Sequence, residues 1–149
     1  MSYQLSVTIC GPGTPEPAHW AFIIHQPPQK KGEIVHVIVL DETNNIFQFE
    51  ARGGHTLTSR QAVGMCKLKT LSSAERSRVV SVLTNEVPAP RGGTKNCQDW
   101  LIDGLVALEV EELVPDGTTA AWAPRVGKLT DEIEEELGGD WIPLKPQKA

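Results

Sequence analysis

Residues 96–108 read NCQDWLIDGLVAL, and this stretch decides the fold class because it predicts a helix with one apolar face. Asn96 is a favoured N-cap residue, and Asp99 stands three residues later, where a capping-box partner belongs. Apolar residues then recur at helical spacing: Cys97, Leu101, Leu105 and Leu108. We therefore expect a helix that begins at Cys97, runs to about Val114 and packs its apolar face against a sheet.

The residues before this helix predict β-strands. Residues 3–9 alternate between apolar and polar side chains, and residues 33–40, EIVHVIVL, are the most strand-like segment of the chain. The expected strands cover residues 3–9, 19–25, 33–40, 46–50 and 65–69. Together they predict an antiparallel meander of four or five strands within residues 3–70.

The rest of the chain predicts helices. Ser72 and Glu75 form a capping-box pattern, so residues 72–114 are expected to hold two helices. A short helix is expected at residues 130–138 and a frayed tail at residues 143–149. A chain of 149 residues is typical of one domain. The sequence thus predicts a single α+β domain over residues 1–149.

Charge and composition argue against several classes of protein. The 14 Lys and Arg residues are outnumbered by 19 Asp and Glu residues, which disfavours a nucleic-acid partner. Apolar runs are too short for an integral membrane segment, and the first residues do not resemble a secretory signal. The three cysteines, Cys10, Cys66 and Cys97, are too widely spaced for a disulfide framework or a zinc ribbon. These features favour a reducing, cytoplasmic location.

Cys97 is the candidate nucleophile because we expect it at the first helical position. The partial positive charge of a helix N-terminus favours thiolate over thiol, and Arg91 and Lys95 are expected to act in the same direction. Gly92 and Gly93 would let a substrate backbone come close, and the N–H groups of the first turn could hold an oxyanion. The alternative interpretation is that Cys97 is only a small core residue.

A thiol nucleophile needs a base, and histidine is the usual one. His19 opens a strand after a Pro-rich loop, and His36 lies inside the next expected strand. If these strands pair as a hairpin, the two side chains can meet when the connection is long and bulged, but the pattern does not require it. The alternatives are an ordinary residue at the start of a strand for His19 and a buried, hydrogen-bonded residue for His36.

Three short motifs together carry a family resemblance. In chain order they are HWAFI at residues 19–23, GEIVHV at 32–37 and NCQDW at 96–100. They resemble the lecithin–retinol acyltransferase-like branch of the circularly permuted papain-like (NlpC-type) thiol hydrolases. In that family a His-Trp-Ala strand precedes a strand with a second histidine, and an Asn-Cys-polar-polar-aromatic motif opens a later helix. The resemblance covers roughly residues 18–38 and 92–113.

Carried over to this chain, the resemblance implies a permuted papain-like fold with a Cys-His-His triad. Cys97 would be the nucleophile, His19 the general base, and His36 the residue that orients His19. The candidate substrate-binding residues are their neighbours in sequence: Trp20, Gly93, Asn96, Gln98 and Trp100. Trp20 and Trp100 are equally suited to the core. No cofactor is implied, and a zinc site of the two histidines and Cys97 lacks a short-spaced ligand pair.

The implied reaction is acyl transfer from an ester, thioester or amide through a thioacyl-enzyme. The substrate would be a small molecule or another acyl or amide compound. The permuted deubiquitinase-like and desumoylating peptidases share the His-then-Cys order, so an isopeptidase of ubiquitin-like conjugates is one alternative. A non-catalytic binding or interaction domain on the same fold is the other.

Overall fold

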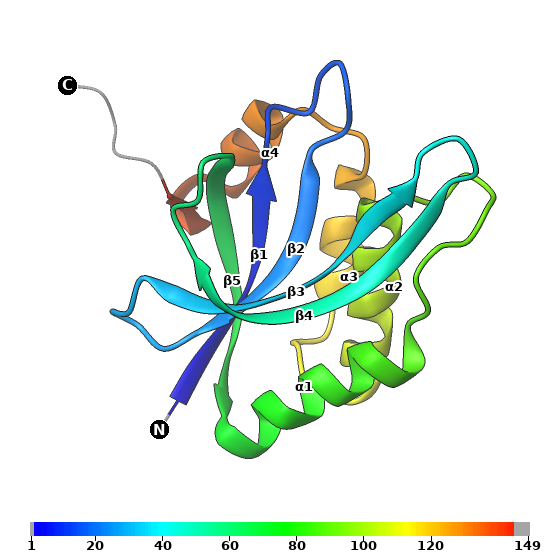
Figure 1. Cartoon of the computed structure of the whole chain (residues 1–149). Helices are drawn as coiled ribbons and strands as arrows, with labels where there is room; N and C mark the ends of the chain where they lie inside the picture. The colour runs from blue at the N-terminus through cyan, green and yellow to red at the C-terminus, as the bar shows by residue number, and fades with distance from the viewer. Residues whose placement is uncertain (1, 145–149) are drawn as a thin grey trace.

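The structure, a computed structural model, describes residues 2–144 as an antiparallel sheet with helices packed on one face (Figure 1). Within these residues the sheet has six strands in the order β4-β3-β2-β1-β5-β6. The strands are β1 (Ser2–Cys10), β2 (His19–His25), β3 (Lys31–Asp41), β4 (Ile46–Thr56), β5 (Ala62–Ser72) and β6 (Trp141–Pro143). This confirms the α+β class and corrects the expected strand number from four or five to six.

The additional strand, β6, lies where the sequence predicts a frayed tail to begin. Trp141–Pro143 pairs with β5, and Leu144 is buried beside it. Residues 145–149 lie outside the described part of the chain. The apolar residues of this short strand keep it on the sheet, which local propensity does not reveal.

The strand order also departs from the predicted meander. β1 to β4 are neighbours in chain order, but β5 crosses to the far side and pairs with β1. Residues 5–9 of β1 are all buried, and their N–H and C=O groups need partners at both edges. β2 supplies one edge and β5 the other, so β1 lies inside the sheet.

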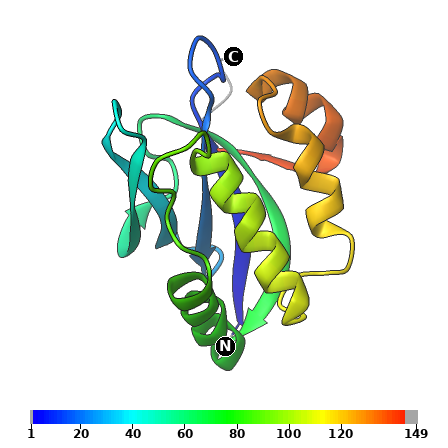
Figure 2. The same ribbon diagram turned by 90° about the vertical axis from the view of Figure 1, so that its right-hand side faces the viewer.

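The helices are α1 (Ser73–Glu86), α2 (Cys97–Val110), α3 (Thr118–Trp122) and α4 (Thr130–Leu137), with short 3-10 turns η1 (Ala123–Arg125) and η2 (Gly138–Asp140). Both predicted capping boxes, Ser72 with Glu75 and Asn96 with Asp99, are present. α2 ends four residues before the expected Val114, and α3 was not predicted. Figure 2 shows α2 in front of the sheet, with α1 and α3 to either side. No helix within residues 2–144 combines the length and apolar character needed to cross a bilayer.

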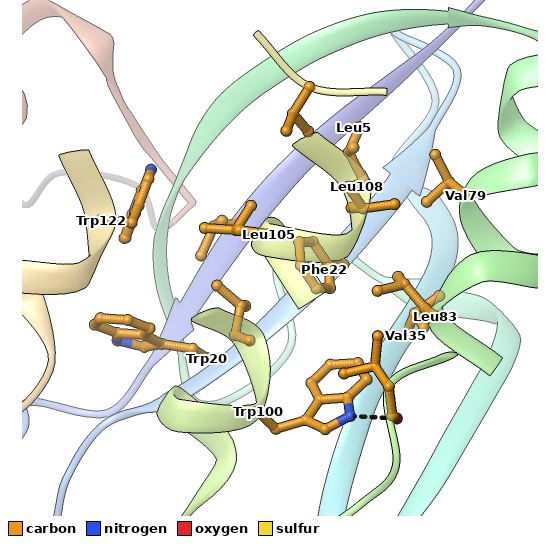
Figure 3. Close-up of a cluster of buried hydrophobic side chains, with 14 of the residues drawn as sticks. Leu5, Trp20, Phe22, Val35, Val79, Leu83, Trp100, Leu105, Leu108 and Trp122 are labelled. Carbon is orange, nitrogen blue, oxygen red and sulfur yellow. Dashed lines mark hydrogen bonds between the residues drawn. The ribbon is translucent and has the colours of Figure 1, made fainter. Parts of the chain in front are cut away.

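The core between α2 and the sheet sets the position of this helix (Figure 3). Trp100 packs edge-on against Phe22 of β2, with 5.9 Å between ring centroids, and its Nε1–H donates to the Val87 carbonyl at 3.0 Å. Gly104 lets the helix approach closely, because a Cβ there would lie 2.9 Å from the Phe22 ring and 3.0 Å from Leu83. The N-terminal end of α2 is therefore held firmly beside β2.

β2 and β3 pair along only part of their length. Their ladder joins residues 22–25 to residues 32–35, and beyond Val35 the β3–β4 hairpin bends away (Figure 1). The tip of this hairpin is tied to the loop before α2: the Gly92 N–H donates to the Asn45 carbonyl, and Asn45 Nδ2 donates to the Lys95 carbonyl. This arrangement opens the sheet next to the N-terminus of α2.

Candidate functional site

A cavity of about 580 Å³ lies in this opening. His19, His36, Asn96 and Cys97 line it, from β2, β3 and the start of α2. The other lining residues are mostly apolar, namely Pro17, Val37, Ile38, Val39 and Phe47. Glu16, Glu42 and Asn45 are the polar ones among them. The three residues of the predicted triad therefore face one cavity, although they are far apart in sequence.

Cys97 occupies the first position of α2, as the sequence predicts. Asn96 accepts hydrogen bonds from the backbone N–H groups of Gln98 and Asp99, at 2.9 and 3.2 Å, and so fixes the first turn. The Cys97 thiol lies 3.9 Å from the Ala18 carbonyl, directly before β2. The backbone N–H groups of Trp20, Cys97 and Gln98 act on the sulfur in the direction that lowers the pKa of the thiol.

The sequence predicts a thiolate at Cys97, but the structure favours the protonated thiol. Burial raises the pKa of the Cys97 thiol above its usual value, and it outweighs the opposing effect of the surrounding N–H groups. Lys95, expected to lower this pKa, instead pairs with Asp103 at 2.8 Å on the exposed side of α2. The sequence pattern shows the helix N-terminus but does not show how deeply the sulfur is buried.

His19 and His36 are in direct contact. His19 Nε2 lies 2.8 Å from His36 Nδ1, and the two rings meet edge-on. Burial, and secondarily the nearby His36, lowers the pKa of His19 to about 4. His19 is therefore an uncharged imidazole at neutral pH, which is the form that accepts a proton.

Glu50 extends this pair and was missed from the sequence. Its Oε1 lies 2.8 Å from His36 Nε2, and β3 and β4 place the two residues directly opposite each other. The hydrogen bond from His36 is the main reason that the pKa of Glu50 lies below its usual value. A turn after residue 40 brings residue 36 opposite residue 50 or 51. The register of this hairpin could therefore have identified Glu50 as a partner of His36.

The predicted substrate-binding residues have different positions. Asn96 lines the cavity, whereas Gly93 is exposed in the preceding loop and does not. The side chains of Trp20, Gln98 and Trp100 are fully buried, so in this structure they are not open to a substrate. The two tryptophans belong to the core, which needs their large apolar surface.

Gln98 has a structural role at this site. Its Nε2 donates to the Ala18 carbonyl at 2.9 Å, and its Oε1 accepts from the Gly127 N–H at 2.8 Å. It thus ties the start of α2 to the start of β2. This bond keeps Cys97 beside His19, which immediately follows Ala18.

A second cavity of about 600 Å³ lies on the other side of His19. The loop of residues 11–17 forms much of its wall, together with Arg60 and Thr130. His19, Glu16 and Pro17 line both cavities. Of His19, His36 and Cys97, His19 is therefore the one next to both cavities, and Cys97 lines only the first.

The arrangement does not resemble a metal site. Both ring nitrogens of His36 are engaged, Nδ1 with His19 and Nε2 with Glu50, so neither is available to a metal ion. Across residues 2–144, no group of three or more His, Cys, Asp or Glu side chains is placed to hold one.

Residues 5–115 match the family described as "Family of unknown function (DUF6540)". The chain belongs to this family. The matched residues of the DUF6540 family include all four of His19, His36, Glu50 and Cys97, whereas α3, α4 and β6 lie outside them. No curated protein and no solved structure matches the chain.

Proposed function

We propose that this protein is a cysteine-dependent hydrolase or acyltransferase that acts on an ester, thioester or amide. One observation carries the proposal: His19, which is hydrogen-bonded to His36, shares a cavity with Cys97 at the N-terminus of α2. A nucleophile, a base and a residue that orients the base are the parts that covalent acyl transfer requires. Their chain order, His-His-Cys, and the packing of α2 on an antiparallel sheet support a permuted papain-like arrangement.

The reaction begins from an uncharged pair. Because the pKa of the thiol is raised and that of His19 is lowered to about 4, Cys97 keeps its proton until a carbonyl is in place. His19 then takes this proton while the sulfur forms a C–S bond with the carbonyl carbon. Asn96 already accepts from the N–H groups of Gln98, Asp99 and Trp100, so the Cys97 N–H is the group of the first turn that would bind the developing oxyanion.

The second half of the reaction releases the substrate in two parts. His19 returns the proton to the departing alcohol, thiol or amine as its bond to the carbonyl carbon breaks, leaving a thioester on Cys97. Water or another acceptor, deprotonated by His19, then attacks this thioester and releases the acyl group. The two cavities beside His19 offer separate places for the acyl group and for the departing group or acceptor.

Intact-mass spectrometry tests this proposal. The full chain is incubated with a panel of esters, thioesters, amides and ubiquitin-like probes, and we expect an acyl adduct that maps to Cys97. Cys97→Ala should abolish both adduct and turnover, and His19→Ala should reduce turnover by at least about 1,000-fold, as for other triads. Cys66→Ala is the control, because Cys66 lines neither cavity.

The outcomes separate the competing functions. An adduct only with ubiquitin-like probes would identify an isopeptidase on the same fold. Turnover that persists in Cys97→Ala would contradict the mechanism. A folded protein that no probe of the panel labels at Cys97 would favour the non-catalytic binding domain.

A further inference from the structure

The hydrogen bond between His19 and His36, beside Cys97, is followed by a second one from His36 to a carboxylate. His36 Nε2 lies 2.8 Å from Glu50 Oε1, and His36 Nδ1 lies 2.8 Å from His19 Nε2. The His36 side chain is 8% exposed, so these two contacts account for its polar atoms. Glu50 itself is one-third exposed and also meets Arg52 Nε at 3.4 Å.

The direction of each hydrogen bond follows from Glu50, the residue at which this series of hydrogen bonds ends. An ionised carboxylate can only accept, so His36 Nε2 must carry a hydrogen. With His36 as a neutral imidazole, which has one N–H group, its Nδ1 is then an acceptor. His19 Nε2 must therefore be the donor to His36, which leaves His19 Nδ1 without a hydrogen.

We propose that Glu50 is a positioning residue that fixes the proton on His19 Nε2 and so keeps Nδ1 free to accept the proton of Cys97. This inference rests on the proposed acyl-transfer function. Nδ1 is the one ring nitrogen of His19 that His36 does not engage. The reverse arrangement, with Nδ1 protonated, would leave Cys97 without a base.

Glu50 also acts after the proton moves. When His19 becomes an imidazolium, its Nε2–H still donates to His36, and the carboxylate at the end of this series of hydrogen bonds stabilises the positive charge. The series crosses the β3–β4 ladder, where His36 and Glu50 face each other as a pair. The pairing of β3 with β4 therefore keeps the Glu50 carboxylate within hydrogen-bonding distance of His36.

The tautomer of His19 tests the proposal directly and needs no substrate. The ring nitrogens of ¹⁵N-labelled histidine distinguish Nδ1–H from Nε2–H, and His19→Gln identifies the His19 signals. In the unmodified protein we expect His19 protonated at Nε2 alone. Glu50→Ala should give a mixture of tautomers. Glu50→Lys places a donor opposite His36 and should shift His19 toward the Nδ1–H form.

Reactivity gives the second readout. Alkylation of Cys97 by iodoacetamide should slow by about 10- to 100-fold in Glu50→Ala, by analogy with the loss of a carboxylate partner behind a metal-binding histidine. Glu50→Gln, which keeps an acceptor oxygen but no charge, should lie between the unmodified protein and Glu50→Ala. Glu50→Lys should be slowest. Gln48→Lys, at an exposed position of the same strand, is the matched control and should leave the rate unchanged.

These results distinguish an error in the role assigned to Glu50 from an error in the proposed acyl-transfer function. An unchanged His19 tautomer in Glu50→Ala and Glu50→Lys would overturn the role of Glu50, even if Cys97 proves catalytic. Equal alkylation rates in all Glu50 variants would do the same. The expected tautomers in a protein that forms no acyl adduct would uphold the hydrogen-bond directions and reject the acyl-transfer function. Circular dichroism on each variant confirms that the fold is retained.

Discussion

At the scale of single residues, burial decides the charge states of the site. The Cys97 thiol and the His19 ring are both held in their uncharged forms, because water cannot fully hydrate the charged form of a buried group. Sequence motifs identify both residues, since a cysteine after an N-cap and a histidine at the start of a strand are local patterns. Their pKa shifts arise from tertiary packing, and for this reason the sequence predicted the wrong state for Cys97.

The depressed pKa of His19 predicts a pH-dependent contribution to stability. An unfolded His19 titrates near 6.5 and the folded one near 4, so between these values the unfolded chain binds more protons. The contribution is complete above about pH 6.5 and is lost as the pH falls to 4. Its full size is at most about 3 kcal/mol, from 1.36 kcal/mol per pKa unit.

Urea unfolding of the unmodified protein and of His19→Gln, from pH 4 to 7, measures this contribution. We expect the free energy of unfolding to rise more steeply with pH in the unmodified protein. The difference between the two proteins removes the effects of other groups, such as His25, whose pKa is also lowered by burial. Parallel curves across this pH range would show that His19 is not buried as described.

At the scale of the element, the N-terminus of α2 combines a structural and a chemical role. Asn96 caps the helix with two hydrogen bonds, and the Asp99 carboxylate accepts from the Asn96 N–H at 2.9 Å. This reciprocal capping was predictable because it involves residues within one turn. The anchoring of the same turn by Gln98 was not, since its partners, Ala18 and Gly127, are distant in sequence.

Removing the cap should therefore affect stability and reactivity together. Asn96→Ala is expected to lower the free energy of unfolding by about 1 kcal/mol and to slow the alkylation of Cys97, because the first turn loosens. Ser72→Ala removes the equivalent cap of α1, which lies far from the cavity. It should cost a similar amount of stability and leave Cys97 unchanged. Equal effects of both variants on alkylation would argue against a specific role for the α2 cap.

At the scale of the whole molecule, the site depends on contacts between distant segments. The sequence predicted the α+β class, the two capped helices and four of the residues that line the cavity: His19, His36, Asn96 and Cys97. It did not predict that β5 would cross to β1, that β6 would dock, or that Glu50 would join His36. Each of these depends on strand pairing, which periodicity within a single strand does not determine.

The link between the hairpin tip and the loop before α2 gives a prediction at this scale. Asn45 has a φ of 54°, which glycine also adopts, so Asn45→Gly retains the backbone and removes the two side-chain bonds to Gly92 and Lys95. We expect faster hydrogen exchange at the Gly92 amide and a higher KM, with the global free energy of unfolding changed by less than about 1 kcal/mol. Asn44→Gly, at the neighbouring exposed turn position, is the control. Unchanged exchange at Gly92 in Asn45→Gly would show that this side chain does not hold the loop.

The partial pairing of β2 and β3 has a consequence for the breadth of compounds that the proposed enzyme would accept. The space beside Cys97 exists because two strands part, and one wall is a two-stranded ribbon that leaves the sheet beyond Val35. Residues 38–48 of this ribbon include neither His36 nor Glu50, and Phe47 is the only one of them that the main core contains. Selection experiments restricted to this ribbon could therefore retune substrate preference while the reacting groups and the buried interior stay as they are.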